Sequence, residues 1–234
     1  MRVHASTQRV KGVDAAVLSR RLAPGLSLAL LCSLLAGCFP TRFEAEPVIP
    51  APLVARIPIV IGVHVTEQFQ NRVHEEERDG ADYTIGVGKA QHAGFMRLMN
   101  AMFERVVPVA TNSPGRGVDP EMRGVLEPTL EDFAFITPRD SGSPLYAVSL
   151  RYRISGYSPE GELIDSWVFT GYGTEAASRI PTQGKASLQQ ATANAMRDAG
   201  AKIATELRNQ AIIRGLLPVE AGDVPVELAP PPAD

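Results

Sequence analysis

Hydrophobic residues in the first half of the chain change from a strand-like to a helix-like spacing. Ile57 to Val65 is a short run rich in Ile and Val, which is typical of a buried strand. From Phe95 to Val106 the apolar residues recur at i, i+3, i+4, i+7, i+8 and i+11, which predicts an amphipathic helix. Residues 69–88 between them are polar and contain glycine, so we expect a surface excursion there.

The second half predicts three strands followed by a long helix. The three strands are Val125–Ile136, residues 146–154 and residues 163–172, with a short additional strand at Val107–Val109. Ser158-Pro159-Glu160-Gly161 has the residues of a type I turn and predicts a hairpin. An alanine-rich stripe from Leu188 to Leu207 predicts a helix that begins near Gln183 and can approach its neighbours closely.

Strands grouped between two helices predict an α+β fold. We expect a mostly antiparallel sheet of four or five strands with both helices packed on one face. The folded domain is predicted to span residues 57–217. Five prolines between Phe39 and Pro58 predict a semi-rigid tether over residues 38–56. Residues 218–234, rich in Pro, Ala and acidic residues, are predicted to be a disordered tail.

Residues 1–37 have the architecture of a signal peptide. Arg20-Arg21 precedes an apolar stretch, Leu26 to Leu35, that is too short to span a bilayer comfortably. Ser19-Arg20-Arg21-Leu22 loosely resembles a twin-arginine signal, although an ordinary basic region explains it as well. Leu35-Ala36-Gly37-Cys38 then matches the lipobox of bacterial lipoproteins at every position.

The lipobox resemblance implies a lipid anchor on Cys38. In that family the cysteine sulfur receives a diacylglycerol, the bond between Gly37 and Cys38 is cut, and the new amino terminus is acylated, for instance with palmitate. Several acyl chains provide stable anchoring. Residue 39 is Phe rather than the Asp that commonly retains such lipoproteins at the inner membrane, which implies the outer membrane of a Gram-negative cell, facing the periplasm.

The layout of residues 35–215 also resembles known small envelope lipoproteins. It is similar to the YajG-like lipoproteins, the auxiliary lipoproteins of ABC-type transport systems and the lipopolysaccharide-assembly lipoprotein. The likeness rests on the order of elements, and only the lipobox is a motif. Cys38 is therefore the one functional residue that the resemblance implies.

Composition and charge exclude several classes of function. The chain is 44% hydrophobic and 21% charged, as in ordinary globular proteins. Residues 1–37 carry five basic residues and one acidic residue, which gives +4 there and leaves −7 for the rest of a chain of net charge −3. An acidic mature chain argues against binding nucleic acid. Because Cys32 is expected to leave with the leader, Cys38 is the only mature cysteine, and no disulfide framework is predicted.

No metal or cofactor site is predicted. His64, His74 and His92 lack the spacing of metal ligands. His74 beside three glutamates could bind a divalent metal weakly, but a solvated acidic loop is the favoured interpretation. Gly86 and Gly88 lack the third glycine of a dinucleotide fingerprint, and residues 141–144 are interpreted as a connection between strands.

Charged residues on the predicted strands are the remaining candidates for a site. Arg151 and Arg153 face the same side and could bind an anion, such as a lipid phosphate, or a partner. They could equally pair with Asp165 or Glu162 across the hairpin. Glu131-Asp132 and Asp165 could form an acid/base pair, although solvated strand faces usually carry such residues.

Aromatic residues give a further criterion for a partner site. Most of them are expected in the core, and any that lie on an uncovered sheet face would mark a site for a protein or lipid partner. The aromatics in question are Phe133, Phe135, Tyr157, Trp167 and Tyr172.

The leading hypothesis is a non-enzymatic accessory lipoprotein that binds an envelope protein or lipid during assembly or transport. One alternative is an envelope hydrolase that uses a carboxylate pair. A purely structural spacer is the other.

Overall fold

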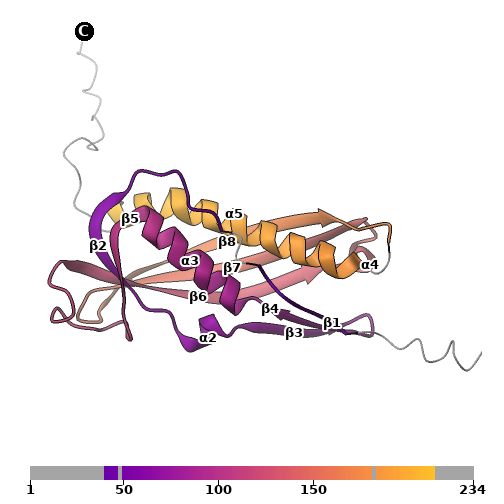
Figure 1. The fold of residues 1–234 in the computed structure, drawn as a ribbon, viewed down its shortest axis with the longest axis horizontal. Coiled ribbons are helices and arrows are strands. Elements are labelled where there is room, and N and C mark those ends of the chain that lie inside the picture. Colours follow the sequence, from indigo (N-terminus) through magenta and orange to yellow (C-terminus); the bar gives the residue numbers. More distant parts are fainter. Residues whose placement is uncertain (1–39, 47–48, 181–182, 214–234) are drawn as a thin grey trace, which may run out of the picture. The chain divides into compact units, whose positions relative to one another are not determined.

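The computed structural model describes residues 40–46, 49–180 and 183–213, which form an α+β fold with two β-sheets (Figure 1). The α+β class predicted from the sequence is therefore confirmed. The predicted signal peptide, the lipobox and the predicted tail at 218–234 lie outside the described residues.

The larger sheet has five strands in the order β5-β2-β6-β7-β8. Their bounds are β2 Ile57–Val63, β5 Phe103–Pro108, β6 Met122–Ile136, β7 Leu145–Tyr157 and β8 Leu163–Ala176. Strand β2 is parallel to both β5 and β6, whereas β6, β7 and β8 form an antiparallel meander. The sheet is thus mixed, and the prediction of a mostly antiparallel sheet is wrong for β2 and β5.

Helix α3, Gly88–Met102, explains the parallel pairing of β2 and β5. Two parallel neighbours need a long crossover connection, and α3 lies in that connection. The helical stripe predicted through Val106 ends at Met102, because Phe103 and Val106 belong to β5. Apolar spacing alone does not separate a helix end from a strand that follows without a loop.

A second sheet of three strands was not expected. Its order is β1-β4-β3, with bounds β1 Thr41–Glu44, β3 Val73–Arg78 and β4 Ala81–Gly86. Strands β3 and β4 form a hairpin around Asp79-Gly80, both with positive φ, as a two-residue hairpin turn requires. The surface excursion predicted for residues 69–88 is therefore wrong over most of its length. The inward-facing residues of β3 are polar, so the apolar alternation that would have predicted a strand is absent.

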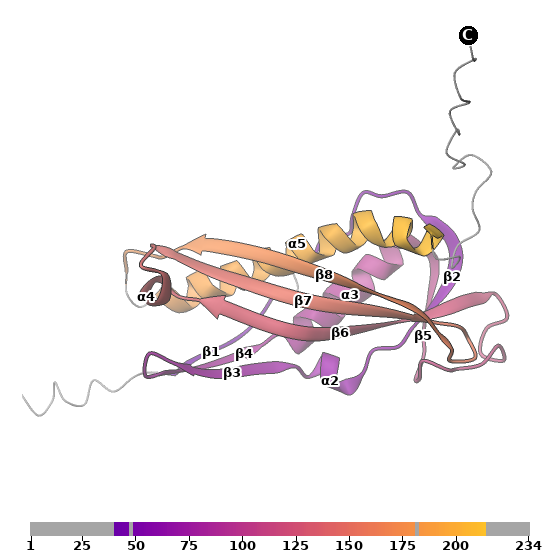
Figure 2. The same cartoon turned by 180° about the vertical axis from the view of Figure 1, so that it is seen from behind.

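Helices α3 and α5, Gly184–Ile213, lie on the same side of the larger sheet in both views (Figures 1 and 2). Two short helices, α2 (Glu67–Gln70) and α4 (Pro138–Ser141), lie in connections. Helix α5 packs closely on β8: a Cβ added at Gly173 would lie 2.1 Å from the carbonyl oxygen of Ala191. The small residues predicted to permit a close approach thus face glycines of the strand.

Residues 40–46, 49 and 50 belong to the folded domain, which differs from the tether predicted over residues 38–56. Strand β1 pairs with β4, and Ile49 is buried between α3 and α5, where its side chain lies over Gly94 and Gly200. Arg97 donates a hydrogen bond of 3.0 Å to the carbonyl oxygen of Ile49. Proline content does not distinguish a free tether from a segment that pairs as a strand or packs on the domain.

Among the described residues, no helix covers the other face of β6, β7 and β8, which we call the open face (Figure 2). Burial alternates along β7, with Val148, Leu150 and Tyr152 in the core and Arg151 exposed. This is the pattern predicted for residues 146–154, a half-buried strand with one face in solvent. The turn predicted at residues 158–161 is also present, since the N–H of Gly161 donates to the carbonyl oxygen of Ser158 at 2.9 Å.

Candidate functional site

The predicted lipidation site at Cys38 lies just before the first strand in the sequence. Gly37 and Cys38 lie outside the described residues, and β1 begins at Thr41, three residues after Cys38. Among the described residues, no helix has the length and hydropathy needed to cross a membrane.

Arg151 and Arg153 meet on the open face, but their partner is Glu131 of β6. Arg153 Nε lies 2.5 Å from Glu131 Oε1, and Arg151 Nε lies 3.1 Å from Glu131 Oε2. Arg153 also donates to the Ser166 hydroxyl on β8 at 3.0 Å. A bulge in β6 between Leu130 and Asp132 brings Glu131 to this position. Glu131 was not among the partners considered from the sequence, and its carboxylate lies between two guanidinium groups at the surface.

The candidate acid/base pair is not assembled. Asp132 is opposite Arg151, which in turn is opposite Thr170 of β8, and Asp165 lies five residues along β8 from Thr170. Two strand spacings across and five residues along separate the two backbones by about 10 Å and about 17 Å, respectively. Carboxylate pairs of glycoside hydrolases are about 5–9.5 Å apart. Glu131 is in addition held by its two arginines. The prediction that these carboxylates form the acid/base pair of a hydrolase is therefore wrong.

Two of the three histidines considered above, His64 and His74, make side-chain contacts. His64 Nδ1 is 2.6 Å from Glu127 Oε2, and His74 Nε2 is 3.0 Å from Glu76 Oε2. The ring of His74 also lies over Phe133, with centroids 4.7 Å apart. His74 therefore belongs to strand β3 and not to a solvated loop. No group of three or more potential metal-ligating side chains occurs among the described residues.

A polar pocket beside α2 was missed by the sequence analysis. Its volume is about 170 Å³, and it is lined by Thr66, Gln68, Phe69, Arg72, Glu127, Thr129 and Leu130. Arg72 Nε is buried there without a hydrogen-bond partner. Glu127, whose carboxylate contacts His64, lies in the same pocket. The pocket can accept a small polar group, but Arg72 and Glu127 bring opposite charges to it and select no single class of ligand.

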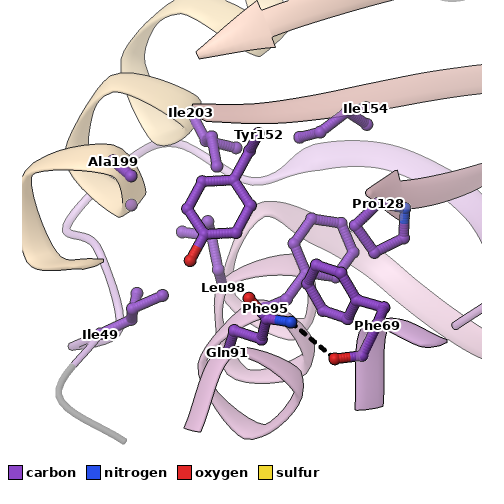
Figure 3. A pocket seen from close by; sticks show the side chains of 11 residues that line it. Ile49, Phe69, Gln91, Phe95, Leu98, Pro128, Tyr152, Ile154, Ala199 and Ile203 are labelled. Atoms are coloured by element: carbon purple, nitrogen blue, oxygen red, sulfur yellow. Dashed lines mark hydrogen bonds between the residues drawn. The ribbon is translucent and has the colours of Figure 1, made fainter. Parts of the chain in front are cut away.

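A second cavity, of about 10 Å³ and lined mostly by apolar side chains, lies beside Ile49 and between β7, α3 and α5 (Figure 3). Tyr152 and Gln91 both face it, and the Tyr152 hydroxyl and Gln91 Oε1 are buried without partners. Gln91 Nε2 donates to the carbonyl oxygen of Phe69 at 2.6 Å. Burial raises the pKa of Tyr152 well above its usual range.

Most of the five aromatic residues considered in the sequence analysis pack in the core, as predicted. Phe133, Phe135 and Trp167 are buried, Tyr157 is half-buried, and Tyr172 is exposed on β8. Lys202 Nζ lies 5.0 Å from the centroid of the Tyr172 ring. Of these five aromatic residues, only Tyr172 is exposed, so they do not form an aromatic cluster on the open face.

Comparison with known proteins identifies no family. No protein-family model matches the chain, and no curated protein matches it. Among solved structures, a DUF330-family protein from Xanthomonas campestris is similar with a TM-score of 0.42 and 14% identity, over 76% of this chain and 96% of that one. A protein from Caulobacter crescentus described as a candidate lipoprotein gives 0.32 and 13%, over 39% and 68%. A hypothetical protein from Chlamydia trachomatis gives 0.36 and 6%, over 69% and 98%. Likeness at this level carries no argument about function.

Proposed function

We propose that the chain is a lipid-anchored lipoprotein of the outer membrane of a Gram-negative cell, with its domain in the periplasm and an accessory, non-enzymatic role. The observation that carries the proposal is the sequence Leu35-Ala36-Gly37-Cys38 behind a basic and then apolar leader. The fold supports it, because β1 begins at Thr41 and the domain thus follows the modified cysteine directly.

The accessory role is binding rather than catalysis. The predicted acid/base pair is separated across the sheet, and Glu131 holds Arg151 and Arg153 in surface ion pairs. We propose an envelope protein or lipid as the partner. The acidic mature chain argues against nucleic acid.

Replacing Cys38 tests the anchor. The Cys38→Ser protein should lose incorporation of labelled palmitate and appear in the soluble fraction, because the acyl chains provide the membrane affinity. Cys32→Ser is the matched control: Cys32 lies in the leader, so this variant should be lipidated and membrane-bound like the wild type. If the Cys38→Ser protein stays in washed membranes, the anchor proposal is wrong.

Replacing Phe39 tests the destination separately. Phe39→Asp introduces the residue that retains such lipoproteins at the inner membrane, so the protein should move from the outer-membrane to the inner-membrane fraction. Phe39→Leu should stay with the outer membrane. An unchanged distribution of Phe39→Asp would contradict the sorting argument and leave the anchor intact.

Crosslinking in whole cells, followed by purification of the anchored protein, tests the binding role. A specific envelope protein or lipid crosslinked to the domain would support it. An activity that survives in the purified protein and needs a carboxylate of the open face would favour the hydrolase alternative instead.

A further inference from the structure

We propose that the end of the larger sheet beside α4, which we call the α4 end, is the surface that meets the bilayer. The inference rests on the proposed lipid anchor at Cys38 and deepens it, because it names the part of the domain that touches the lipid. Two separate observations point to this end: the place where the chain enters the domain, and the distribution of apolar residues on the open face.

The chain enters the domain at the α4 end. Thr41, the first residue of β1, is opposite Tyr83 of β4. The Tyr83 ring lies against Phe135 of β6, with centroids 4.9 Å apart, and Ile136 is the last residue of β6. Arg78 Nη1 of β3 lies 2.9 Å from Asp140 Oδ2 of α4, which joins the small sheet to the same end. Figures 1 and 2 show β1 and α4 at one end of the domain.

The length of the connection limits how far this end can be from the lipid. Three residues separate Cys38 from Thr41, and a fully extended chain spans at most about 3.3–3.6 Å per residue. The acylated residue therefore lies within about 10 Å of Thr41. The prolines at 47, 50 and 52 add no reach, because they follow β1 and not the anchor.

The open face is apolar at this end. We call the five residues that make this surface the apolar corner: Ala134, Ile136, Leu145, Ala147 and Ala176. Ile136 is opposite Ala147, and Leu145 is opposite Ala176, so that neighbouring strands contribute adjacent side chains. Ile136 is 43% exposed and Leu145 is 41% exposed. Ile180, in the segment after β8, is 53% exposed at the same end.

Along β7, the open face becomes polar with distance from the α4 end. On β7 the apolar corner gives way to Ser149 and then to Arg151 and Arg153, which form ion pairs with Glu131. Arg151 lies six residues from Leu145, about 20 Å along the strand. Laying the whole open face on a bilayer would push these charges into the interface, whereas contact through the α4 end presents the apolar corner together with the exposed Thr174 of β8 and keeps the Glu131 ion pairs in water.

The opposite end of the hairpin is also apolar, which makes the comparison sharp. Leu163, at the start of β8, is 57% exposed and Ile164 is 39% exposed. Leu163 is opposite Tyr157, twelve residues and about 40 Å along β7 from Leu145. The exposed apolar residues alone would allow either end to contact the bilayer. The proposed anchor favours the α4 end, because the chain between Cys38 and Thr41 spans only about 10 Å and cannot reach the other end.

Charges at the α4 end are nearly balanced, so attraction to anionic lipid adds little. Arg139, Arg179 and Lys185 are exposed there, and Glu77, Asp79 and Asp82 of the β3–β4 hairpin offset them. We therefore expect the contact to depend on apolar burial and on the anchor and to change little with salt.

The test uses the lipidated full-length mature protein in vesicles of phosphatidylethanolamine and phosphatidylglycerol. Because Cys38 is acylated and Cys32 is lost with the leader, a single introduced cysteine can carry a fluorescent label without competing thiols. Leu145→Cys places the label at the α4 end, and Leu163→Cys is the matched control, an exposed leucine at the start of the neighbouring strand. Quenching by nitroxide-bearing lipids reports which label lies near the bilayer.

The expected result is quenching several-fold stronger at position 145 than at position 163, with little change between low and high salt. Equal quenching at both positions, or stronger quenching at 163, overturns the proposal. Recovery of the protein with the vesicles is measured in the same samples. A protein that does not float with the vesicles refutes the anchor, whereas a floating protein with position 145 in water refutes only the orientation.

Discussion

The close approach of α5 to β8 depends on Gly173, so Gly173→Ala should destabilise the domain strongly. A Cβ at this position would lie 2.1 Å from the Ala191 carbonyl oxygen and 2.3 Å from the Ala195 nitrogen, where ordinary contact begins at 3.4 Å. Both neighbours are backbone atoms and cannot rotate away. The helix must therefore move outward by about 1 Å or the strand must bend.

The free energy of this displacement follows from the contacts that it stretches. A gap of 0.5–1 Å forfeits about a quarter to a half of the dispersion attraction of each contact. The residues concerned, Leu188, Ala191, Ala195 and Met196, are fully buried. Overpacking of this kind costs about 1–3 kcal/mol, and the loss of unfolded-state freedom on replacing glycine returns about 0.4–1 kcal/mol. We expect a net loss of about 1–2 kcal/mol from a total of about 5–15 kcal/mol.

Urea unfolding of the leaderless Cys38→Ser protein measures the effect, with Trp167 as the probe. It is the single tryptophan, is buried, and lies on β8 six residues from the substitution. Gly117→Ala is the control: it is exposed, and an added Cβ meets nothing within 4 Å, so its stability should change by less than about 0.5 kcal/mol or rise slightly. If Gly173→Ala unfolds at the same urea concentration as Gly117→Ala, the close-packing argument is refuted.

Three further substitutions test separate parts of the structure. Tyr152→Phe removes a buried hydroxyl without a hydrogen-bond partner, so stability should stay level or rise by up to about 1–2 kcal/mol, and a loss above about 1 kcal/mol in urea unfolding would contradict this. Asp140→Asn should cost about 0.5–1 kcal/mol near neutral pH, because the carboxylate accepts the 2.6 Å hydrogen bond from the Thr137 N–H that caps α4. That hydrogen bond lowers the pKa of Asp140. Its contribution to stability is therefore complete above the ordinary pKa of about 3.9 and is lost as the pH falls through the lower pKa of the folded state. If the wild type were still more stable than Asp140→Asn at pH 2, this explanation would be wrong. Replacing both Asp198 and Lys202 by Ala removes two side chains that hydrogen-bond the outer edge of β8, and concentration-dependent self-association in sedimentation is the expected result, which a strictly monomeric double variant would exclude.

The candidate site was predictable only in its local parts. Arg151 and Arg153 share a strand face because side chains alternate, and that alternation is visible in the sequence. Their partner was not predictable, since Glu131 reaches them through a bulge in a strand that precedes them by about twenty residues. Arg72 and Glu127 line the same pocket although 55 residues separate them in the sequence, and their spacing does not predict that pocket.

The sequence by itself determined the features that depend on a few neighbouring residues. These include the lipobox at Cys38, the turn at residues 158–161, the alternating strand β7 and the alanine-rich helix α5. Only the tertiary structure decided the features that depend on which segments become neighbours: the parallel pairing of β2, the polar hairpin of β3 and β4, and the packing of residues 40–46, 49 and 50 onto the domain. The physical reason is that spacing encodes which face of an element is buried, whereas its neighbour is chosen by the packing of the whole chain. The proposed anchor shows the same division: Cys38 and its motif are visible in the sequence, whereas the fold decides at which end of the domain β1 begins.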